Sequence, residues 1–103
     1  MKKYIVIVTP EAEEGIRESF RYIQDSSPQN AELWIRQLYA EIDTLEEFPE
    51  RCMYARERDY LEEDLRQLIF KSHRVIFQVD NTSGTVFVLY VRHSSRRAVG
   101  EPE

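Results

Sequence analysis

The stretch Leu65–His93, LRQLIFKSHRVIFQVDNTSGTVFVLYVRH, decides the fold of this chain. It contains three apolar runs, rich in β-branched and aromatic residues, that predict strands. These are Leu65–Phe70, Arg74–Asp80 and Thr85–His93. Lys71-Ser72-His73 is a short hairpin connection, and Asn81-Thr82-Ser83-Gly84 is a turn with glycine at its end. Strands joined by connections this short predict an antiparallel meander.

The residues before this stretch predict one more strand and two helices. Residues 3–8 are β-branched and aromatic, and Thr9-Pro10 then opens a helix with Thr9 as N-cap and proline at the first position. Ser27 and Pro28 repeat this start for a second helix, which Pro49 terminates. The two apolar stripes are Ala12, Ile16, Phe20 and Ile23, and Ala31, Trp34, Leu38, Ile42 and Leu45. We therefore expect a helical hairpin over residues 10–48 that buries both stripes.

The order β-α-α-β-β-β predicts an α+β fold, with an antiparallel sheet covered on one face by the helical hairpin. We expect a single domain over residues 1–97, a connecting loop with one helical turn at 50–64, and a frayed tail at 98–103. In the run Val86–Val91 both the odd and the even positions are apolar. Because alternate residues of a strand point to opposite faces, both faces of the last strand avoid water. Either the loop at 50–64 or a partner chain covers the second face, and we favour a partner.

Charge is distributed unevenly along this 103-residue chain, whose formal net charge is −5. Residues 1–64 carry eight Lys and Arg against sixteen Asp and Glu, whereas residues 65–100 carry six against Asp80 alone. The C-terminal third is therefore a basic island on an acidic protein. This asymmetry favours an anionic target or partner, although charges that merely solvate strand ends would produce the same pattern.

Other compositional features favour a cytoplasmic protein. No segment approaches the roughly 20 apolar residues of a membrane span, and the start at Met1–Val8 is too short for a signal peptide. The single cysteine, Cys52, cannot form an internal disulfide, which agrees with a reducing compartment.

Several local signatures, taken in their order, resemble the RelE/ParE toxin superfamily over about residues 3–97. They begin with Thr9-Pro10-Glu11-Ala12, Tyr22-Ile23, Ser27-Pro28 and Phe48-Pro49. They continue with Leu65-Arg66-Gln67-Leu68, His73–Val79, Val88–His93 and Arg96-Arg97. The resemblance implies the toxin of a type II toxin–antitoxin, or plasmid stabilisation, system that a cognate antitoxin neutralises. The family needs no metal or cofactor, so Glu57, Glu62, Glu63 and Asp64 are interpreted as a solvated charge run.

The resemblance leaves two activities open. ParE-like members inhibit growth by binding DNA gyrase, and RelE-like members cut messenger RNA on the ribosome. A RelE-like enzyme would use Arg66 and Arg74 as cations and His93 as acid or base. However, Ser94–Glu103 contains no aromatic residue, and Gln67 and Leu68 stand where such enzymes place a lysine. We therefore favour the ParE-like activity, with the ribonuclease as the alternative.

The resemblance also implies two binding surfaces. The expected target-binding residues are the cations Arg66, Lys71, Arg74, Arg92, Arg96 and Arg97. The expected antitoxin-binding residues are Phe87, Leu89 and Val91 of the last strand, because antitoxins dock apolar anchors and add strand edges.

Some of these residues also have a purely structural interpretation. Trp34 lies at helical spacing, which favours the core over a platform for base stacking. Arg74 could equally cover the sheet with its aliphatic stem or pair with Asp64. His73 is interpreted as a hairpin residue, His93 as hydrogen-bonded scaffold unless it is catalytic, and Cys52 as structural.

Overall fold

The antiparallel meander predicted for the C-terminal half is confirmed. In the computed structural model, which describes residues 3–102, its strands are β2 (Leu65–Phe70), β3 (His73–Asp80) and β4 (Thr85–His93). The bounds of β2 and β4 are those expected. β3 begins one residue early because Lys71 and Ser72 alone form the turn, with Lys71 at a φ of +52°. His73 is therefore a strand residue.

The first strand, β1 (Ile5–Val8), completes a four-stranded sheet in the order β1-β4-β3-β2. The predicted α+β fold class is confirmed, but β1 runs parallel to β4 rather than antiparallel. A hairpin loop dictates the direction of the strands that it joins. β1 has no such loop to its neighbour, so the sequence carries no local signal for its direction.

Two helices follow β1, α1 (Pro10–Ser26) and α2 (Pro28–Asp43), and both start as predicted. The Thr9 hydroxyl oxygen accepts a hydrogen bond from the Ala12 N–H at 3.3 Å, and Ser27 caps α2 in the same way. Thr9 Oγ1 also donates to the Val88 carbonyl at 2.8 Å, which ties the start of α1 to β4. The cap therefore sets where the helical hairpin meets the sheet.

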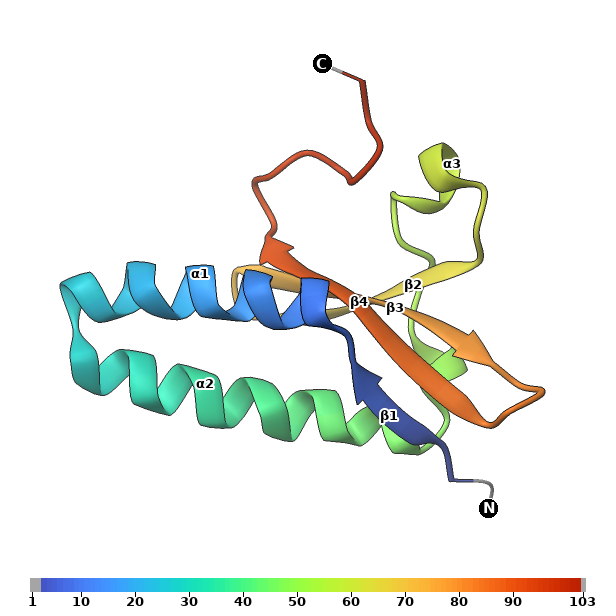
Figure 1. Cartoon of the computed structure of the whole chain (residues 1–103), viewed down its shortest axis with the longest axis horizontal. Coiled ribbons are helices and arrows are strands. Elements are labelled where there is room, and N and C mark those ends of the chain that lie inside the picture. The colour runs from blue at the N-terminus through green and yellow to red at the C-terminus, as the bar shows by residue number, and fades with distance from the viewer. Residues whose placement is uncertain (1–2, 103) are drawn as a thin grey trace.

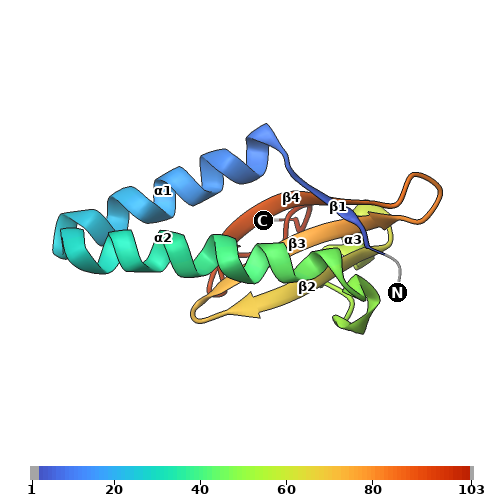
Figure 2. The same ribbon diagram turned by 90° about the horizontal axis from the view of Figure 1, so that it is seen from below.

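The helical hairpin covers one face of the sheet, and its turn end extends beyond the strands (Figures 1 and 2). The predicted stripes lie on this buried side: Ala12, Ile16, Trp34, Leu38 and Ile42 are all buried. They pack against sheet residues that include Val75, Phe77, Val86 and Val88. The interpretation of Trp34 as a core residue is thus confirmed.

The predicted end of the second helix is wrong. α2 stops at Asp43, and Leu45 lies in a following 3₁₀ turn at Thr44–Glu46. Pro49 does not terminate a helix but begins another 3₁₀ turn, Pro49–Arg51, because proline has no N–H to satisfy at a first helical position. Phe48 before it has a φ of +45° and an exposed side chain.

The segment after Pro49 crosses to the second face of the sheet, and its one helical turn, α3 (Arg58–Leu61), is as expected. Ala55 and Leu61 pack there against Leu65 and Ile76, with Leu89 and Tyr90 beside them. The chain itself therefore covers this part of the second face, and the prediction that a partner does so is wrong here. Ile5, Ile7 and Ile69 on the remaining part are exposed.

An irregularity in β4 explains its run of apolar residues. The register of β3 and β4 shifts between Ile76 and Phe77, which face Tyr90 and Val88, so Leu89 is an extra residue in β4. Val88 and Val91 consequently both pack in the core beneath the helices, whereas Leu89 and Tyr90 pack on the second face. A β-bulge thus accounts for the loss of simple alternation.

The C-terminal segment, which the sequence predicts to fray, makes packing contacts over its described residues 98–102. Ala98 is buried, and Gly100 lies so close to α3 that an added Cβ would approach Leu61 Cδ2 within 2.7 Å. Tyr60 Oη donates to Glu101 at 3.1 Å. Met1 and Lys2 of the expected single domain and Glu103 of the predicted tail lie outside the described residues.

None of the helices in residues 3–102 has the length and apolarity that crossing a bilayer requires.

Candidate functional site: a histidine-lined pocket

A pocket of about 680 Å³ opens where the second half of α1 crosses the ends of β3 and β4. We call it the histidine pocket, because His73 and His93 both line it. Its apolar walls include Ile23, Trp34 and Val91. Its polar lining is Glu18, Ser19, Tyr22, Lys71, Ser72, His73, Arg92, His93, Ser95 and Arg96. Four elements, α1, α2, β3 and β4, therefore build one concave surface.

His73 lies at the base of this pocket and is only 8% exposed. Its ring packs against Trp34 at 5.1 Å and against His93 at 5.3 Å between centroids, and its Nε2 lies 3.0 Å from Ser19 Oγ. Nδ1 is buried and has no hydrogen-bond partner among residues 3–102. Burial, and then the neighbouring His93, lowers the pKa of His73, so the ring is uncharged at neutral pH. The interpretation of His73 as a mere hairpin residue is wrong.

Ser95 determines which ring nitrogen of His93 carries the hydrogen in the neutral imidazole. The Ser95 backbone N–H donates to His93 Nδ1 at 3.0 Å, and Ser95 Oγ lies 2.7 Å from the same atom. A backbone N–H can only donate, so Nδ1 is unprotonated and Nε2 carries the hydrogen in the neutral ring. His93, which is exposed, therefore presents an N–H donor.

Three of the predicted cations line the pocket: Lys71, Arg92 and Arg96. The Lys71 ammonium donates to Gln37 Oε1 at 2.7 Å, and the Arg96 guanidinium lies 4.0 Å from Glu18. Burial, and then the charge of Arg96, lowers the pKa of Arg92, whose buried Nε has no partner among the described residues. With Glu18 as the single acidic residue in this lining, the site is electropositive.

Arg66 lies outside the pocket. It faces Phe77 in the pairing of β2 with β3, and its Nη1 donates to the carbonyls of Cys52 at 2.7 Å and Glu50 at 3.1 Å. Its guanidinium lies 4.4 Å from the centre of the Tyr54 ring. Arg66 therefore holds the 50–54 segment against the edge strand.

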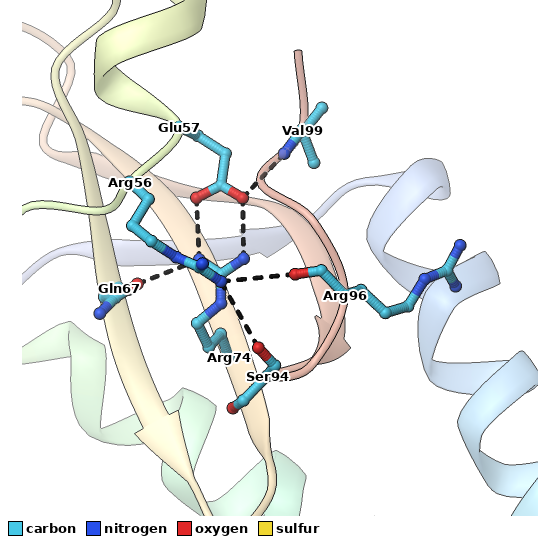
Figure 3. A network of polar contacts seen from close by, with 7 residues as sticks. All are labelled: Arg56, Glu57, Gln67, Arg74, Ser94, Arg96 and Val99. Carbon is cyan, nitrogen blue, oxygen red and sulfur yellow. Dashed lines mark hydrogen bonds and ion pairs between the residues drawn. The ribbon is translucent and has the colours of Figure 1, made fainter. Parts of the chain in front are cut away.

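Arg74 is buried on the second face and is only 3% exposed (Figure 3). Its two terminal nitrogens donate to Glu57 at 2.8 and 2.9 Å, and Nη1 also donates to Gln67 at 3.0 Å. The expected pairing with Asp64 is thus wrong, since Asp64 lies 3.5 Å from Arg58 instead. Because its charge is neutralised internally, Arg74 offers little to an external target.

Glu57 is fully buried, so the interpretation of this residue as part of a solvated charge run is wrong. Besides Arg74, its carboxylate accepts the backbone N–H of Val99 at 2.9 Å, which joins the C-terminal segment to the sheet (Figure 3). Burial alone would raise the pKa of Glu57, but hydrogen bonds from Arg74 and Val99 outweigh it and hold this pKa below its ordinary value. Glu57 is therefore an ionised structural residue.

Two further cations, Arg56 and Arg97, contact the segment that follows β4. Arg56 donates to the carbonyls of Ser94 and Arg96 at 3.4 Å, and Arg97 donates to the Pro102 carbonyl at 3.2 Å. Figure 3 shows the Arg96 side chain directed away from Glu57 and towards α1. The predicted target-binding cations therefore do not form one group. Lys71, Arg92 and Arg96 line the pocket, and Arg97 lies outside its lining.

The three residues predicted to bind an antitoxin, Phe87, Leu89 and Val91, differ in their burial. Val91 is only 3% exposed and lies beneath α1, where Gly15 approaches its backbone, and it contributes to the wall of the histidine pocket. Phe87 and Leu89 are half-buried, and Phe87 pairs with the exposed Ile7 of β1.

Sequence reasoning missed His73, Ser95 and Gly15 as contributors to this site. His73 faces His93 directly in the pairing of β3 with β4, so a correct two-residue turn would have placed the two rings side by side. Nothing local in the sequence predicts the approach of Gly15 to Val91. Within residues 3–102, no three His, Cys, Asp or Glu side chains gather closely enough to hold a metal ion.

Comparisons with known proteins agree with this architecture. A family model described as ParE toxin of type II toxin-antitoxin system, parDE, matches residues 6–98. Among solved structures, the toxin–antitoxin complex RelBE2 from Mycobacterium tuberculosis contains a similar chain, with a TM-score of 0.58 and 19% identity. The match covers 93% of this chain and 97% of that one, and at this identity it supports the shared fold alone. The comparison with curated proteins finds no matching relative.

Proposed function

This chain belongs to the ParE toxin family of type II toxin–antitoxin systems, and from this we propose that it is the toxin of such a pair and inhibits growth by binding DNA gyrase. A cognate antitoxin holds it inactive. Lys71, Arg92 and Arg96 of the histidine pocket contribute the target-binding charge, and Arg66 and Arg97, which lie outside the pocket, add to it. Phe87 and Leu89, beside Ile7, remain a proposed part of the antitoxin surface.

One observation favours binding over cleavage. A RelE-like mechanism would need Arg66, Arg74 and His93 close together, and these three residues lie apart. Arg74 is engaged with Glu57, and Arg66 is engaged with the carbonyls of the 50–52 segment. Of these three residues, only His93 lines the pocket. Stabilising a phosphorane-like transition state requires cations positioned around one reacting group, and this arrangement does not supply them.

The tautomer of His93 supports the same choice. A general base must accept the proton of the ribose 2′-hydroxyl at a free ring nitrogen. Nδ1 of His93 accepts from Ser95, and Nε2 already carries a hydrogen in the neutral ring. His93 is therefore suited to donate to a ligand rather than to activate a nucleophile.

One observation favours the ribonuclease as the second candidate. The pocket places the Nε2–H donor of His93 next to Arg92 and Arg96, which is the pairing that a general acid and a phosphate-binding cation would require. A His93→Ala variant would then lose growth inhibition while its antitoxin binding stayed intact.

The deciding experiment is induction of the chain without antitoxin, followed by separate measurements of DNA supercoiling and of translation. We expect purified protein to inhibit gyrase supercoiling or to trap cleaved DNA, and to leave ribosome-bound messenger RNA intact. Coexpression with the antitoxin should abolish the effect. Cleavage of messenger RNA at the ribosomal A site without any effect on gyrase would replace the proposal with the second candidate.

A further inference from the structure

We propose that the histidine pocket is the anchoring site for the antitoxin, and that it receives one large apolar side chain together with a neighbouring carboxylate from an antitoxin segment. This inference rests on the proposed function, because it presupposes an antitoxin. It goes beyond that function by assigning a location and a chemistry to the contact.

The walls of the pocket suit a bulky apolar side chain. Ile23, Trp34 and Val91 line it, and Tyr22 at its mouth is 79% exposed although it is a large aromatic residue. A volume of about 680 Å³ lies within the range of pockets that enclose a ligand. Exposed tyrosines next to an apolar hollow are typical of protein interfaces, where aromatic anchors carry much of the binding energy.

The polar part of the pocket suits a carboxylate beside that anchor. His93 presents its Nε2–H, and Arg92 and Arg96 add positive charge on the same side. Each of these groups donates hydrogen bonds, and a carboxylate accepts two or more. The buried Nδ1 of His73, which has no partner among the described residues, marks an unused hydrogen-bonding position in the lining.

The combination favours a peptide over a nucleic acid. A nucleic-acid backbone is bound by rows of cations along an open surface. This pocket instead is concave, and apolar walls from Ile23, Trp34 and Val91 make up part of its lining beside the cations. A peptide segment instead brings an apolar group and a carboxylate into one small volume.

The location also explains how an antitoxin could neutralise the toxin. Lys71, Arg92 and Arg96 belong to the cations proposed to bind the target, and all three line the pocket. A segment seated there would cover these charges and exclude the target by direct competition.

The test uses the full chain and the product of the reading frame next to its gene, with affinity measured by titration calorimetry. Tyr22→Ala and Arg96→Glu alter the pocket, and Tyr39→Ala and Arg36→Glu are matched changes at exposed positions of α2 outside its lining. We expect the two pocket variants to bind at least tenfold more weakly, and the two controls to bind like wild type. Circular dichroism and urea unfolding check that all four variants are folded.

A second pair of variants tests the donor at His93. Glutamine can place an amide N–H near the position of Nε2, so His93→Gln should retain antitoxin affinity within about threefold, whereas His93→Leu should lose tenfold or more. Trp34 is the single tryptophan of the chain and lines the pocket, so its fluorescence should change when antitoxin binds.

The outcomes separate this inference from the proposed function. If wild type binds the antitoxin and all pocket variants bind equally well, the pocket is not the anchor and only this inference fails. If wild type neither binds that protein nor inhibits growth, the proposed function itself fails. A Trp34 signal with a short oligonucleotide, abolished by Arg96→Glu while antitoxin affinity is unchanged, would identify a nucleic-acid site and overturn the inference.

Discussion

At the scale of single residues, the pair of Glu57 and Arg74 controls the second face of the sheet. Both side chains are almost completely removed from solvent, and each is the charged partner of the other. We predict that Glu57→Gln lowers the free energy of unfolding by about 3–5 kcal/mol at neutral pH, because it leaves the Arg74 charge buried and uncompensated. Urea unfolding followed by circular dichroism measures this loss.

Glu63→Gln is the control, because Glu63 is an exposed carboxylate of the same segment. The pKa of Glu57 is held below its ordinary value of 4.5, so its stabilising effect is present above pH 4.5 and is lost as pH falls through the folded-state pKa. The difference between wild type and Glu57→Gln should therefore shrink in acid. Equal stability of the two carboxylate variants at neutral pH would contradict the role of Glu57.

His73 makes the stability of the fold sensitive to mildly acidic pH. Its pKa lies below the ordinary value of 6.5 because of burial and then His93, so the unfolded chain binds a proton before the folded chain does. Its contribution is fully present above pH 6.5 and is lost as pH falls through the folded-state pKa. The other ionisable groups that line this pocket are Glu18, Tyr22, Lys71, Arg92, His93 and Arg96.

We predict that His73→Phe, which keeps an aromatic ring against Trp34, flattens the fall in unfolding free energy between pH 7.5 and pH 5. Chemical unfolding at several pH values, with NMR titration of both histidines in the wild type, measures the effect. If the variant retains the full pH dependence of the wild type, His73 is not its source.

At the scale of elements, the contact between α1 and β4 determines the shape of the histidine pocket. An ideal Cβ on Gly15 would lie 2.3 Å from the Val91 carbonyl oxygen, so the helix can approach the strand only because residue 15 is glycine. Both residues line the pocket. The spacing of these two elements is therefore set by a backbone contact.

We predict that Gly15→Ala destabilises the protein by about 1–3 kcal/mol, because overpacking of the helix against the strand outweighs the better helix propensity of alanine, about 1 kcal/mol. Thermal unfolding measures this loss. Arg21→Ala on an exposed position of α1 serves as control and should change stability little. A Gly15→Ala variant that is more stable than wild type would show that α1 has room to move.

At the scale of the whole molecule, the C-terminal segment closes the second face of the sheet. Val99 donates to Glu57, Ala98 is buried, and Gly100 packs against Leu61 of α3. We predict that truncation after Arg97 costs about 1–3 kcal/mol of stability, because the buried Glu57 carboxylate loses a donor and apolar surface is exposed.

Urea unfolding of the truncated chain tests this prediction, with Glu101→Gln as a control that changes the segment without removing it. The truncated chain should also bind a hydrophobic dye more strongly than wild type. Stability equal to that of wild type would mean that residues 98–103 behave as the frayed tail that we expected from their sequence.

Much of the fold could be predicted because its signals are local. Thr9 and Ser27 cap their helices with bonds to residues three positions later, and a two-residue turn joins β2 to β3. The candidate site was only partly predicted. Lys71, Arg92, His93 and Arg96 line one pocket, but Arg66 and Arg74 have other partners. The sequence shows that these side chains are positively charged. It does not show that Arg74 is paired with Glu57 or that Arg66 is bound to backbone carbonyls.

The sequence by itself determined the strands of the basic C-terminal stretch, the two capped helices and the family, because each depends on neighbours within a few residues. Tertiary structure alone decided the parallel pairing of β1, the burial of Glu57 and the meeting of His73 with His93 beneath α1. Glu57 and Arg74 are 17 residues apart and Gly15 and Val91 are farther still, so these contacts exist only once the chain has packed. The histidine pocket is a product of that packing, and with it the surface that we assign to the antitoxin.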